Sequence, residues 1–311
     1  MSGRPDVVCL GILVADVIAR PVDALPPAGT LGLLDEITLH GGGCALNTAT
    51  VLARFGSRSA VAGKVGADPF GQFVLALLAE RGIDSTGVLQ DDSVPTSSTV
   101  VLVDGRGERT FLHTTGANGA LRADELDPDL LCAGRALHIA GALVLPQLDG
   151  EPLAEILASA HRRGILTSLD IVWDASGRWE RATPALPQLD VFLASAGEAT
   201  AISREEKPES AAAWLLDRGA KRVALKLGAE GCYVADEGVA EHVPAPRVET
   251  IDGTGAGDAF AAGLLYGLLA GWPLVRAARL ANAAGALATT AVGASDGVRG
   301  VDEAMQLAGI G

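Results

Sequence analysis

The order of strand-like and helix-like segments is the feature of this chain that most restricts its fold. From about residue 135 onward, apolar runs typical of buried strands alternate with helical patterns: RALHIAG, EPLAEILASAHRRG, ILTSLDIV, DVFLASA, SAAAWLLDRGA and KRVALKLG. Strands that alternate with helices form βαβ crossovers, and such crossovers place their strands side by side in a parallel sheet. The sequence therefore predicts a doubly wound α/β fold, in which helices flank a mostly parallel sheet.

The N-terminal half shows the same alternation with one interruption. VVCLGILVADVI and SAVAGKVG each indicate a buried strand, and helical patterns cover residues 44–55 and the segment DPFGQFVLALLAERG. STVVLVD and ERTFLHT flank a glycine-containing turn and predict a hairpin, which interrupts the alternation together with the strand-like LGLLDEITLH. We therefore expect one domain over residues 1–311, with a small β lid formed by segments of about 14–40 and 96–115.

Composition agrees with this fold class and narrows the possible partners. Hydrophobic residues make up 49% of the chain and aromatic residues only 4%, so the core must consist largely of Ala, Leu and Val. The net charge is −14 and no run of Lys or Arg is present, which argues against nucleic acid and anionic membranes as partners. The cysteines show no C-x-x-C pairing and indicate reduced thiols. The chain does not start with the pattern of a secretory signal, so we expect a cytoplasmic protein.

The strongest chemical motif is ETIDGTGAGDAFAAGLL, a glycine-rich turn that continues directly into a helix. Its glycines let the backbone fold back, and the first turn of a helix carries unpaired N–H groups at its positive dipole end. We expect the amides of Gly255, Ala256 and Gly257 to face a transferring phosphoryl group. Asp258 is then placed to accept the proton of the attacking hydroxyl group, although Asp is favoured at helix starts in any case and a plain helix cap is the alternative.

Two distant motifs resemble the signatures of one enzyme family. GGGCALNTATVLARFG resembles the first signature of the ribokinase and phosphofructokinase-B type carbohydrate kinases, and DGTGAGDAFAAGLL resembles the second. Four further segments also resemble the family, so the similarity covers nearly the whole chain: VGADPFGQFVLALLAERGID, GERTF, KLGAEGCYV and ANAAGALATTAVGAS. The resemblance implies a ribokinase-like fold and Mg²⁺-assisted transfer of the γ-phosphoryl group of ATP to a hydroxyl of a small sugar. A nucleoside kinase and a catalytically silent sugar-binding relative are the alternatives.

The resemblance also implies site residues and an oligomeric state. The expected substrate-binding residues are Asp16, Gly42, Gly43 and Asn47. The expected nucleotide-binding residues are Lys226, Gly228, Gly231, Thr254 and Asn282. The expected metal-site residues are Glu198 and Asp252, of which Asp252 would order the glycine turn or bind a monovalent cation such as K⁺. The lid pairs with a second subunit in some relatives, so a homodimer through the lid is expected.

Three positions depart from the family pattern. The family commonly has an Asn-x-x-Glu motif that organises Mg²⁺, and here Ser195 replaces the Asn while Glu198 remains. Lys226 stands where many relatives have Thr, and is expected either to meet a phosphate or to lie in solvent. The segment LDIVWDASGRW lacks the Asp-x-Asn-x-Arg pattern of many sugar kinases, which weakens the case for a carboxylated sugar and leaves Asp170 and Asp174 as functional residues or caps. The chain has neither a Walker loop nor a G-x-G-x-x-G sequence, so other nucleotide-binding folds are not indicated.

Overall fold

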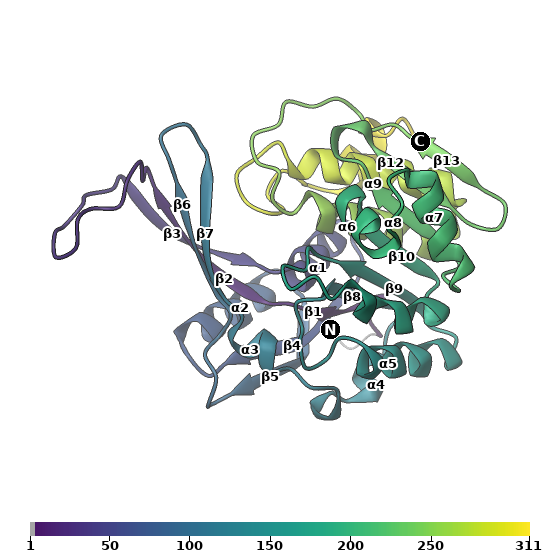
Figure 1. Ribbon diagram of the computed structural model, residues 1–311, viewed down its shortest axis with the longest axis horizontal. Helices are drawn as coiled ribbons and strands as arrows, with labels where there is room; N and C mark the ends of the chain where they lie inside the picture. The colour runs from purple at the N-terminus through teal and green to yellow at the C-terminus, as the bar shows by residue number, and fades with distance from the viewer. Residues whose placement is uncertain (1–3) are drawn as a thin grey trace.

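The structure is a computed structural model that describes residues 4–311, so residues 1–3 of the predicted domain lie outside the described range. Within that range the strands form two sheets, one of nine strands in the order β13-β12-β11-β10-β9-β8-β1-β4-β5 and one of four in the order β3-β2-β6-β7. Figure 1 shows helices against both faces of the large sheet, while the four-stranded sheet, which we call the small sheet, projects to one side. The predicted doubly wound α/β fold is confirmed.

The large sheet is parallel from β5 to β11, and only the β11–β12 and β12–β13 pairings are antiparallel. Its strands are β1 Val7–Gly11, β4 Ser59–Gly66, β5 Asp84–Asp91, β8 Ala136–Ala142, β9 Leu166–Ile171, β10 Val191–Ser195, β11 Val223–Lys226, β12 Cys232–Ala235 and β13 Ala240–Val243. The helices are α1 Cys44–Arg54, α2 Pro69–Glu80, α3 Gly116–Ala120, α4 Pro128–Leu131, α5 Glu151–Arg162, α6 Ala196–Ser203, α7 Pro208–Asp217, α8 Ala256–Leu269, α9 Leu274–Ala288 and α10 Val301–Leu307. Three short 3₁₀ segments complete the described fold: η1 Ala123–Glu125, η2 Trp179–Gln188 and η3 Gly228–Glu230.

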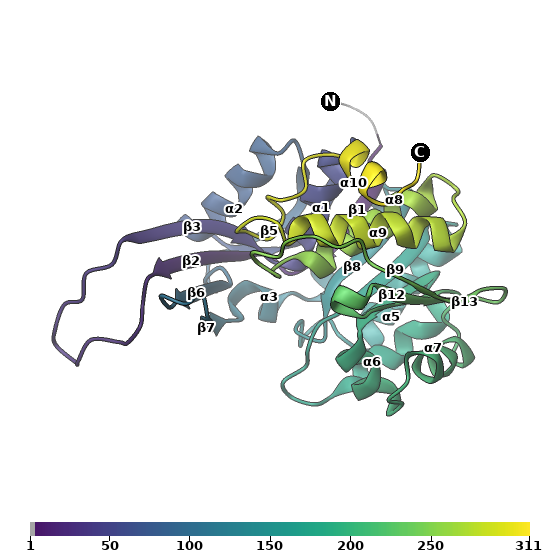
Figure 2. The ribbon, with the colours of Figure 1, turned by 90° about the horizontal axis from the view of Figure 1, so that it is seen from above.

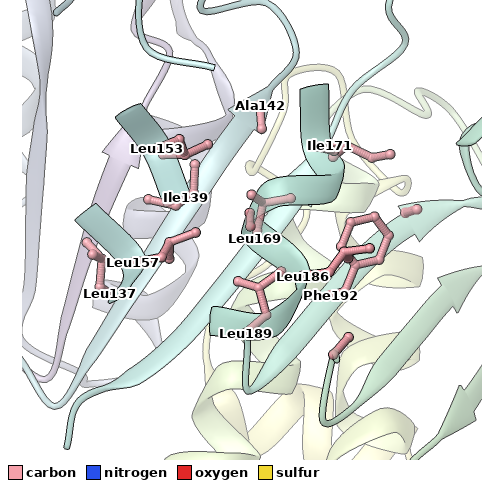
Figure 3. Packing of buried hydrophobic residues seen from close by; sticks show 14 of the residues in the cluster. Leu137, Ile139, Ala142, Leu153, Leu157, Leu169, Ile171, Leu186, Leu189 and Phe192 are labelled. Atoms are coloured by element: carbon pink, nitrogen blue, oxygen red, sulfur yellow. The ribbon is translucent and has the colours of Figure 1, made fainter. Parts of the chain in front are cut away.

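The two faces of the large sheet are packed with different side chains. On one face, aliphatic residues of β8 and β9 such as Ile139 and Leu169 meet Leu153 and Leu157 of α5 (Figure 3). On the other face α1, α8 and α9 are rich in alanine and glycine, and the last two helices lie close together because a Cβ at Gly263 would be 2.8 Å from the Cα of Ala281. The core therefore has the Ala, Leu and Val character that the composition predicts.

The small sheet is made of β2 Val14–Arg20, β3 Glu36–Gly42, β6 Ser98–Val103 and β7 Arg109–Thr114. The prediction of one continuous strand over VVCLGILVADVI was wrong, because β1 belongs to the large sheet and β2 to the small one. The break falls at Leu13, whose N–H donates to Asn118 Oδ1 over 3.1 Å and whose C=O accepts from Asn118 Nδ2 over 2.9 Å. With both backbone groups bound to a side chain, Leu13 cannot continue a strand ladder.

The connection between β2 and β3 forms the far end of the molecule (Figure 2). At its root, Gly42 ends β3 and Gly43 takes a φ of 92°, where a Cβ would lie 2.4 Å from the C=O oxygen of Ile12. Only glycine fits this turn, which brings the small sheet directly into α1. The small sheet is therefore joined to the large one next to a helix that the sequence assigns to the site.

The apolar segment 259–275 is divided between α8 and α9. In the part of the chain that the structure describes, no helix is both long and apolar enough to cross a membrane. The cysteines at positions 9, 44, 132 and 232 are free thiols, as predicted.

Candidate active site

The predicted site residues gather at the carboxyl ends of the parallel strands. Asp170 lies near the end of β9, and Ser195 and Lys226 end β10 and β11 as direct neighbours in the sheet register. In open α/β sheets, ligands bind in the crevice outside these strand ends. The topology alone therefore indicates a ligand site at the carboxyl ends of β9, β10 and β11.

The glycine turn leads into α8 with the geometry that the motif requires. Gly255 is the N-cap residue with a φ of 74°, and a Cβ there would lie 1.9 Å from the C=O oxygen of Ala294. This conformation needs glycine, and it opens the first turn of α8 with its backbone amides unpaired within the helix. Residues 253–257, which we call the anion loop, therefore lead into the positive end of a long helix, and within them the Thr254 N–H donates to Asp252 and the Ala256 N–H donates to the Gly253 C=O over 3.4 Å.

Asp258 lies in the first turn of α8 and is 8% exposed. Its Oδ2 accepts a hydrogen bond from Asn47 Nδ2 of α1 over 2.8 Å, so the side chain is directed to another helix. Burial raises the pKa of the Asp258 carboxyl group, and hydrogen bonds from Asn47 and Cys44 together with the charge of Lys226 offset only part of this effect. A buried carboxylate with a raised pKa, held beside an anion site, is suited to accept a proton.

Asn47 has an unused hydrogen-bonding group in this setting. Its side chain is 5% exposed, and its Nδ2 is committed to Asp258. Among residues 4–311, no group donates to its Oδ1. A buried amide oxygen without a partner is costly in a folded protein, and a bound hydroxyl group would satisfy it.

Lys226 reaches the anion loop from the end of β11. Its Nζ lies 2.6 and 2.7 Å from the two carboxylate oxygens of Asp170, and a Cβ at Gly257 would be 3.3 Å from that Nζ. Burial lowers the pKa of Lys226, but the Asp170 carboxylate outweighs this, so the pKa lies above its usual range and the ammonium keeps its charge. The alternative that Lys226 lies in solvent does not hold, since only 16% of its side chain is exposed, and its role toward a phosphate stays a prediction.

Ser195 and Glu198 form a capping box at the start of α6. The Ser195 hydroxyl accepts from the Glu198 N–H over 3.4 Å, and Glu198 Oε2 accepts from the Ser195 N–H over 2.6 Å. One oxygen of Glu198 is thus used locally, and its charge still acts on Asp170 and Lys226. Within residues 4–311, no group of three or more His, Cys, Asp or Glu side chains is placed to hold a metal ion.

Asp252 and Thr254 flank the start of the anion loop. The Asp252 carboxylate accepts from the N–H of Thr254 over 2.9 Å and from the N–H of Gly293 over 3.0 Å. It also pairs with Arg109 of β7, whose Nη2 lies 2.6 Å from Oδ2, and the same guanidinium donates to the Thr254 hydroxyl. The small sheet thus contacts the anion loop directly.

The residues predicted to bind substrate at the small sheet also lie together. Asp16 of β2 pairs in register with His40 of β3 and Thr99 of β6. Burial raises the pKa of Asp16, while the Thr99 hydroxyl and the neighbouring His113 and His40 act in the opposite direction. A Cβ at Gly42 would lie 2.1 Å from Asp16 Oδ2, so this glycine makes room for the carboxylate.

Three predicted nucleotide-binding residues lie at the far edge of the large sheet. Gly228 and Gly231 form the turn between β11 and β12, and a Cβ at Gly231 would meet the C=O oxygen of Val243 at 2.1 Å. The Asn282 amide of α9 donates to the Val243 C=O over 2.8 Å. In this structure these three residues shape and fasten the end of the sheet, and their role toward a nucleotide stays a prediction.

No contact partners could be read from the sequence for three side chains that belong to the site, and only Asp170 of the three was a candidate. Cys44 is the first residue of α1 and donates to Asp258, Asp170 holds Lys226, and Arg109 holds Asp252. Asp170 carried a signal, because an aspartate near the end of an apolar strand is costly unless it is paired. Arg109 and Cys44 stand within segments that the family resemblance covers, but nothing in their local sequence shows what they contact.

Comparisons with known proteins identify the family of this chain. The model of the family described as pfkB family carbohydrate kinase matches residues 4–299. A fructokinase of Klebsiella pneumoniae is 35% identical over 81% of this chain and 87% of its own, and a 2-dehydro-3-deoxygluconokinase of Bacillus subtilis is 32% identical over 87% and 88%. A candidate ribokinase II of E. coli, solved in complex with ATP and Mg²⁺, superposes with a TM-score of 0.84 at 26% identity over 97% of this chain and 98% of its own. The chain belongs to the pfkB family of carbohydrate kinases.

Proposed function

We propose that this carbohydrate kinase transfers the γ-phosphoryl group of ATP to a hydroxyl group of a small monosaccharide, with Asp258 as the base. The observation that carries the proposal is the pairing of Asp258 with Asn47 at the start of α8. It places a buried carboxylate of raised pKa beside an amide oxygen that has no partner among the described residues. A sugar with two adjacent hydroxyl groups satisfies both, because one donates to Asn47 Oδ1 while the other donates to Asp258.

The residues around this pair then have distinct tasks. The amides of Gly255, Ala256 and Gly257 stabilise the charge on the transferring phosphoryl oxygens. Lys226 adds a fixed positive charge beside them, held in place by Asp170. As the hydroxyl oxygen attacks phosphorus in line with the leaving group, its proton passes to Asp258. Positioning and charge therefore account for most of the catalysis.

ATP and Mg²⁺ are the expected partners of the anion loop. Mg²⁺ is held mainly by nucleotide phosphates and water, so one or two carboxylates of the protein are enough. Glu198 fits this requirement, because one of its oxygens is fixed by the Ser195 N–H and the other remains available to a metal-bound water. When bound, the ion neutralises phosphate charge during the transfer.

The small sheet provides the remaining contacts to the sugar. Asp16 and Gly42 lie on the sheet face that also carries His40, Thr99 and His113. A carboxylate is a directional acceptor for sugar hydroxyls, and a lid over the site would exclude water. Fructose, ribose or a similar sugar is the preferred substrate, and a nucleoside is the second choice. The relative named 2-dehydro-3-deoxygluconokinase keeps keto-sugar acids in the test panel.

We also propose that the small sheet forms a homodimer through its outer face, in a cytoplasmic protein. Strand register places Ile37, Leu39, Val100 and Leu112 on the face opposite Asp16, where they are 67%, 39%, 39% and 58% exposed. Side chains on a strand alternate between faces, so these four form one apolar surface. Contiguous exposed apolar surface commonly marks a protein interface.

The assignment is tested by measuring ADP release with Mg·ATP against a panel of monosaccharides, keto-sugar acids and nucleosides. Turnover of one panel member by the wild type identifies the substrate class. Binding of sugars without turnover of any member would instead support the catalytically silent relative. Direct calorimetry with each sugar separates that outcome from a panel that lacks the substrate.

A further inference from the structure

Arg109 is the first residue of β7, and strand register sets the direction of its side chain. It pairs with Val103, so it lies on the same sheet face as Phe111, His113 and Asp16, the face turned toward the site. From there it contacts Asp252 and Thr254, which lie 143 and 145 positions later in the sequence. The side chain of an arginine of the small sheet thus contacts the anion loop. This loop belongs to the part of the molecule built on the large sheet, which we call the large domain.

Both oxygens of the Asp252 carboxylate are engaged at the anion loop. Oδ1 accepts from the Thr254 N–H, and Oδ2 accepts from the Gly293 N–H and pairs with Arg109. The carboxylate therefore joins the segment before α8, the segment after α9 and the small sheet. Only 4% of the Asp252 side chain is exposed, so its surroundings leave little access for water or a free ion.

The charge of this carboxylate is compensated inside the protein. Burial raises the pKa of Asp252, but the hydrogen bonds from Arg109, Thr254 and Gly293 outweigh burial, and the pKa lies below its usual range. A buried carboxylate that stays ionised needs a counter-charge. Family resemblance suggested a monovalent cation here, but the donors around Asp252 do not fit one, because a guanidinium already occupies that position.

We propose that the guanidinium of Arg109 takes the place of a free monovalent cation at the anion loop, so that docking of the small sheet organises the loop. The inference rests on the proposed role of residues 253–257 as the phosphate site. Because the positive charge belongs to β7, it reaches Asp252 only when the small sheet lies against the large domain. Closure over the sugar and ordering of the anion loop are thereby one event.

The first test compares kinase rates in K⁺ with rates in tetramethylammonium at the same ionic strength. The wild type is expected to change by less than about twofold, since its cation is covalently attached. Arg109→Gln is expected to lose about tenfold or more in tetramethylammonium, because a buried carboxylate without its partner is strongly destabilised, and to recover in K⁺ or guanidinium. Arg106→Gln is the matched control on the same hairpin, since Arg106 is 85% exposed and pairs with Asp104.

The second test needs no substrate. The thermal unfolding midpoint of Arg109→Gln should rise with K⁺, while the midpoints of wild type, Arg109→Lys and Arg106→Gln should not. The inference would be overturned if K⁺ activated the wild type severalfold. It would also be overturned if neither the rate nor the unfolding midpoint of Arg109→Gln changed with K⁺. A wild type without turnover on any sugar would count against the proposed function, and the midpoints would still decide the role of Arg109.

Discussion

The large and the small sheet differ in how their strands are covered. All seven residues of β8 in the large sheet are buried, whereas all five residues that follow Arg109 in β7 are exposed. The large sheet therefore fixes its polar groups by surrounding them, as it does with Asp170 of β9, which is 4% exposed. The small sheet acts only where a side chain reaches across, as Arg109 does. The proposed reaction needs polar groups that are held by buried surroundings. Covering a substrate needs single side chains that reach across from a second sheet.

The two faces of the small sheet also differ from each other in the side chains that they carry. The face turned toward the site carries Asp16, His40 and His113, and the outer face carries Leu39 and Leu112. Helices contact the small sheet only near its root, where α2 lies against β2 and β3, and its projecting part stands clear of the helices that cover the large sheet (Figure 1). Substitutions in the large sheet should consequently lower activity and stability, whereas substitutions on the outer face of the small sheet should mainly weaken assembly.

The largest expected effect follows from replacing Asp258, the proposed proton acceptor. Asp258→Asn removes the proton acceptor and keeps the side-chain volume, so kcat should fall by about 10²–10⁴-fold. The coupled ADP-release assay measures the loss, and calorimetry with ATP checks that the nucleotide still binds. Asp302→Asn at the exposed start of α10 is the control. A kcat within about threefold of the wild type would reduce Asp258 to a structural residue.

The next effect compares one residue type in both sheets. Leu169→Ala on β9 removes a fully buried side chain and should lower the free energy of unfolding by about 2–5 kcal/mol. Leu112→Ala on β7, where the leucine is 58% exposed, should change it by less than about 0.5 kcal/mol. Urea titrations of both variants at a protein concentration that keeps them monomeric provide the comparison. Equal losses would show that the small sheet has a core of its own.

The same contrast explains how far the sequence could predict the structure. The alternation of strands and helices predicted the large sheet, because buried parallel strands are continuously apolar and need no knowledge of distant residues. The break between β1 and β2 was missed, since it depends on the side chain of Asn118, more than a hundred positions away from Leu13. Local pattern therefore specified the elements, and long-range hydrogen bonds decided which sheet they join.

The features of the site also divide into those that local sequence predicts and those that depend on distant residues. The anion loop and Asp258 were readable because glycine spacing and a following helix have a local physical meaning. The partners of Lys226 and Asp252 were not readable, because each lies on a strand that is distant in sequence. Charged side chains at a strand end show that a partner must exist, but only the fold shows which one.

A smaller effect concerns the pH dependence of the base. Asp258 must be ionised to accept a proton, and its raised pKa means that kcat falls as the pH drops through that value. Asn47→Ala removes a hydrogen bond that favours the ionised form, so the acidic limb of the kcat profile should move to higher pH. Thr48→Ala is the matched control, since its hydroxyl contacts the Asp258 C=O over 3.3 Å and leaves the carboxylate alone.

The outcome of that experiment separates two roles of Asn47. An unchanged acidic limb with a raised KM would mean that Asn47 binds the sugar and has little influence on Asp258. A shifted limb at unchanged KM would mean the reverse. Both changes together are expected, because the two ends of the amide face different partners.

The smallest effect is expected at the outer face of the small sheet. Leu112→Lys places a charge in the proposed interface and should raise the dissociation constant of the dimer by about tenfold or more, as measured by analytical ultracentrifugation. Phe111→Lys is the matched control, because Phe111 is equally exposed at 58% but lies on the inner face. If Phe111→Lys weakens the dimer and Leu112→Lys does not, the inner face is the interface, and the small sheet could not cover the site while paired.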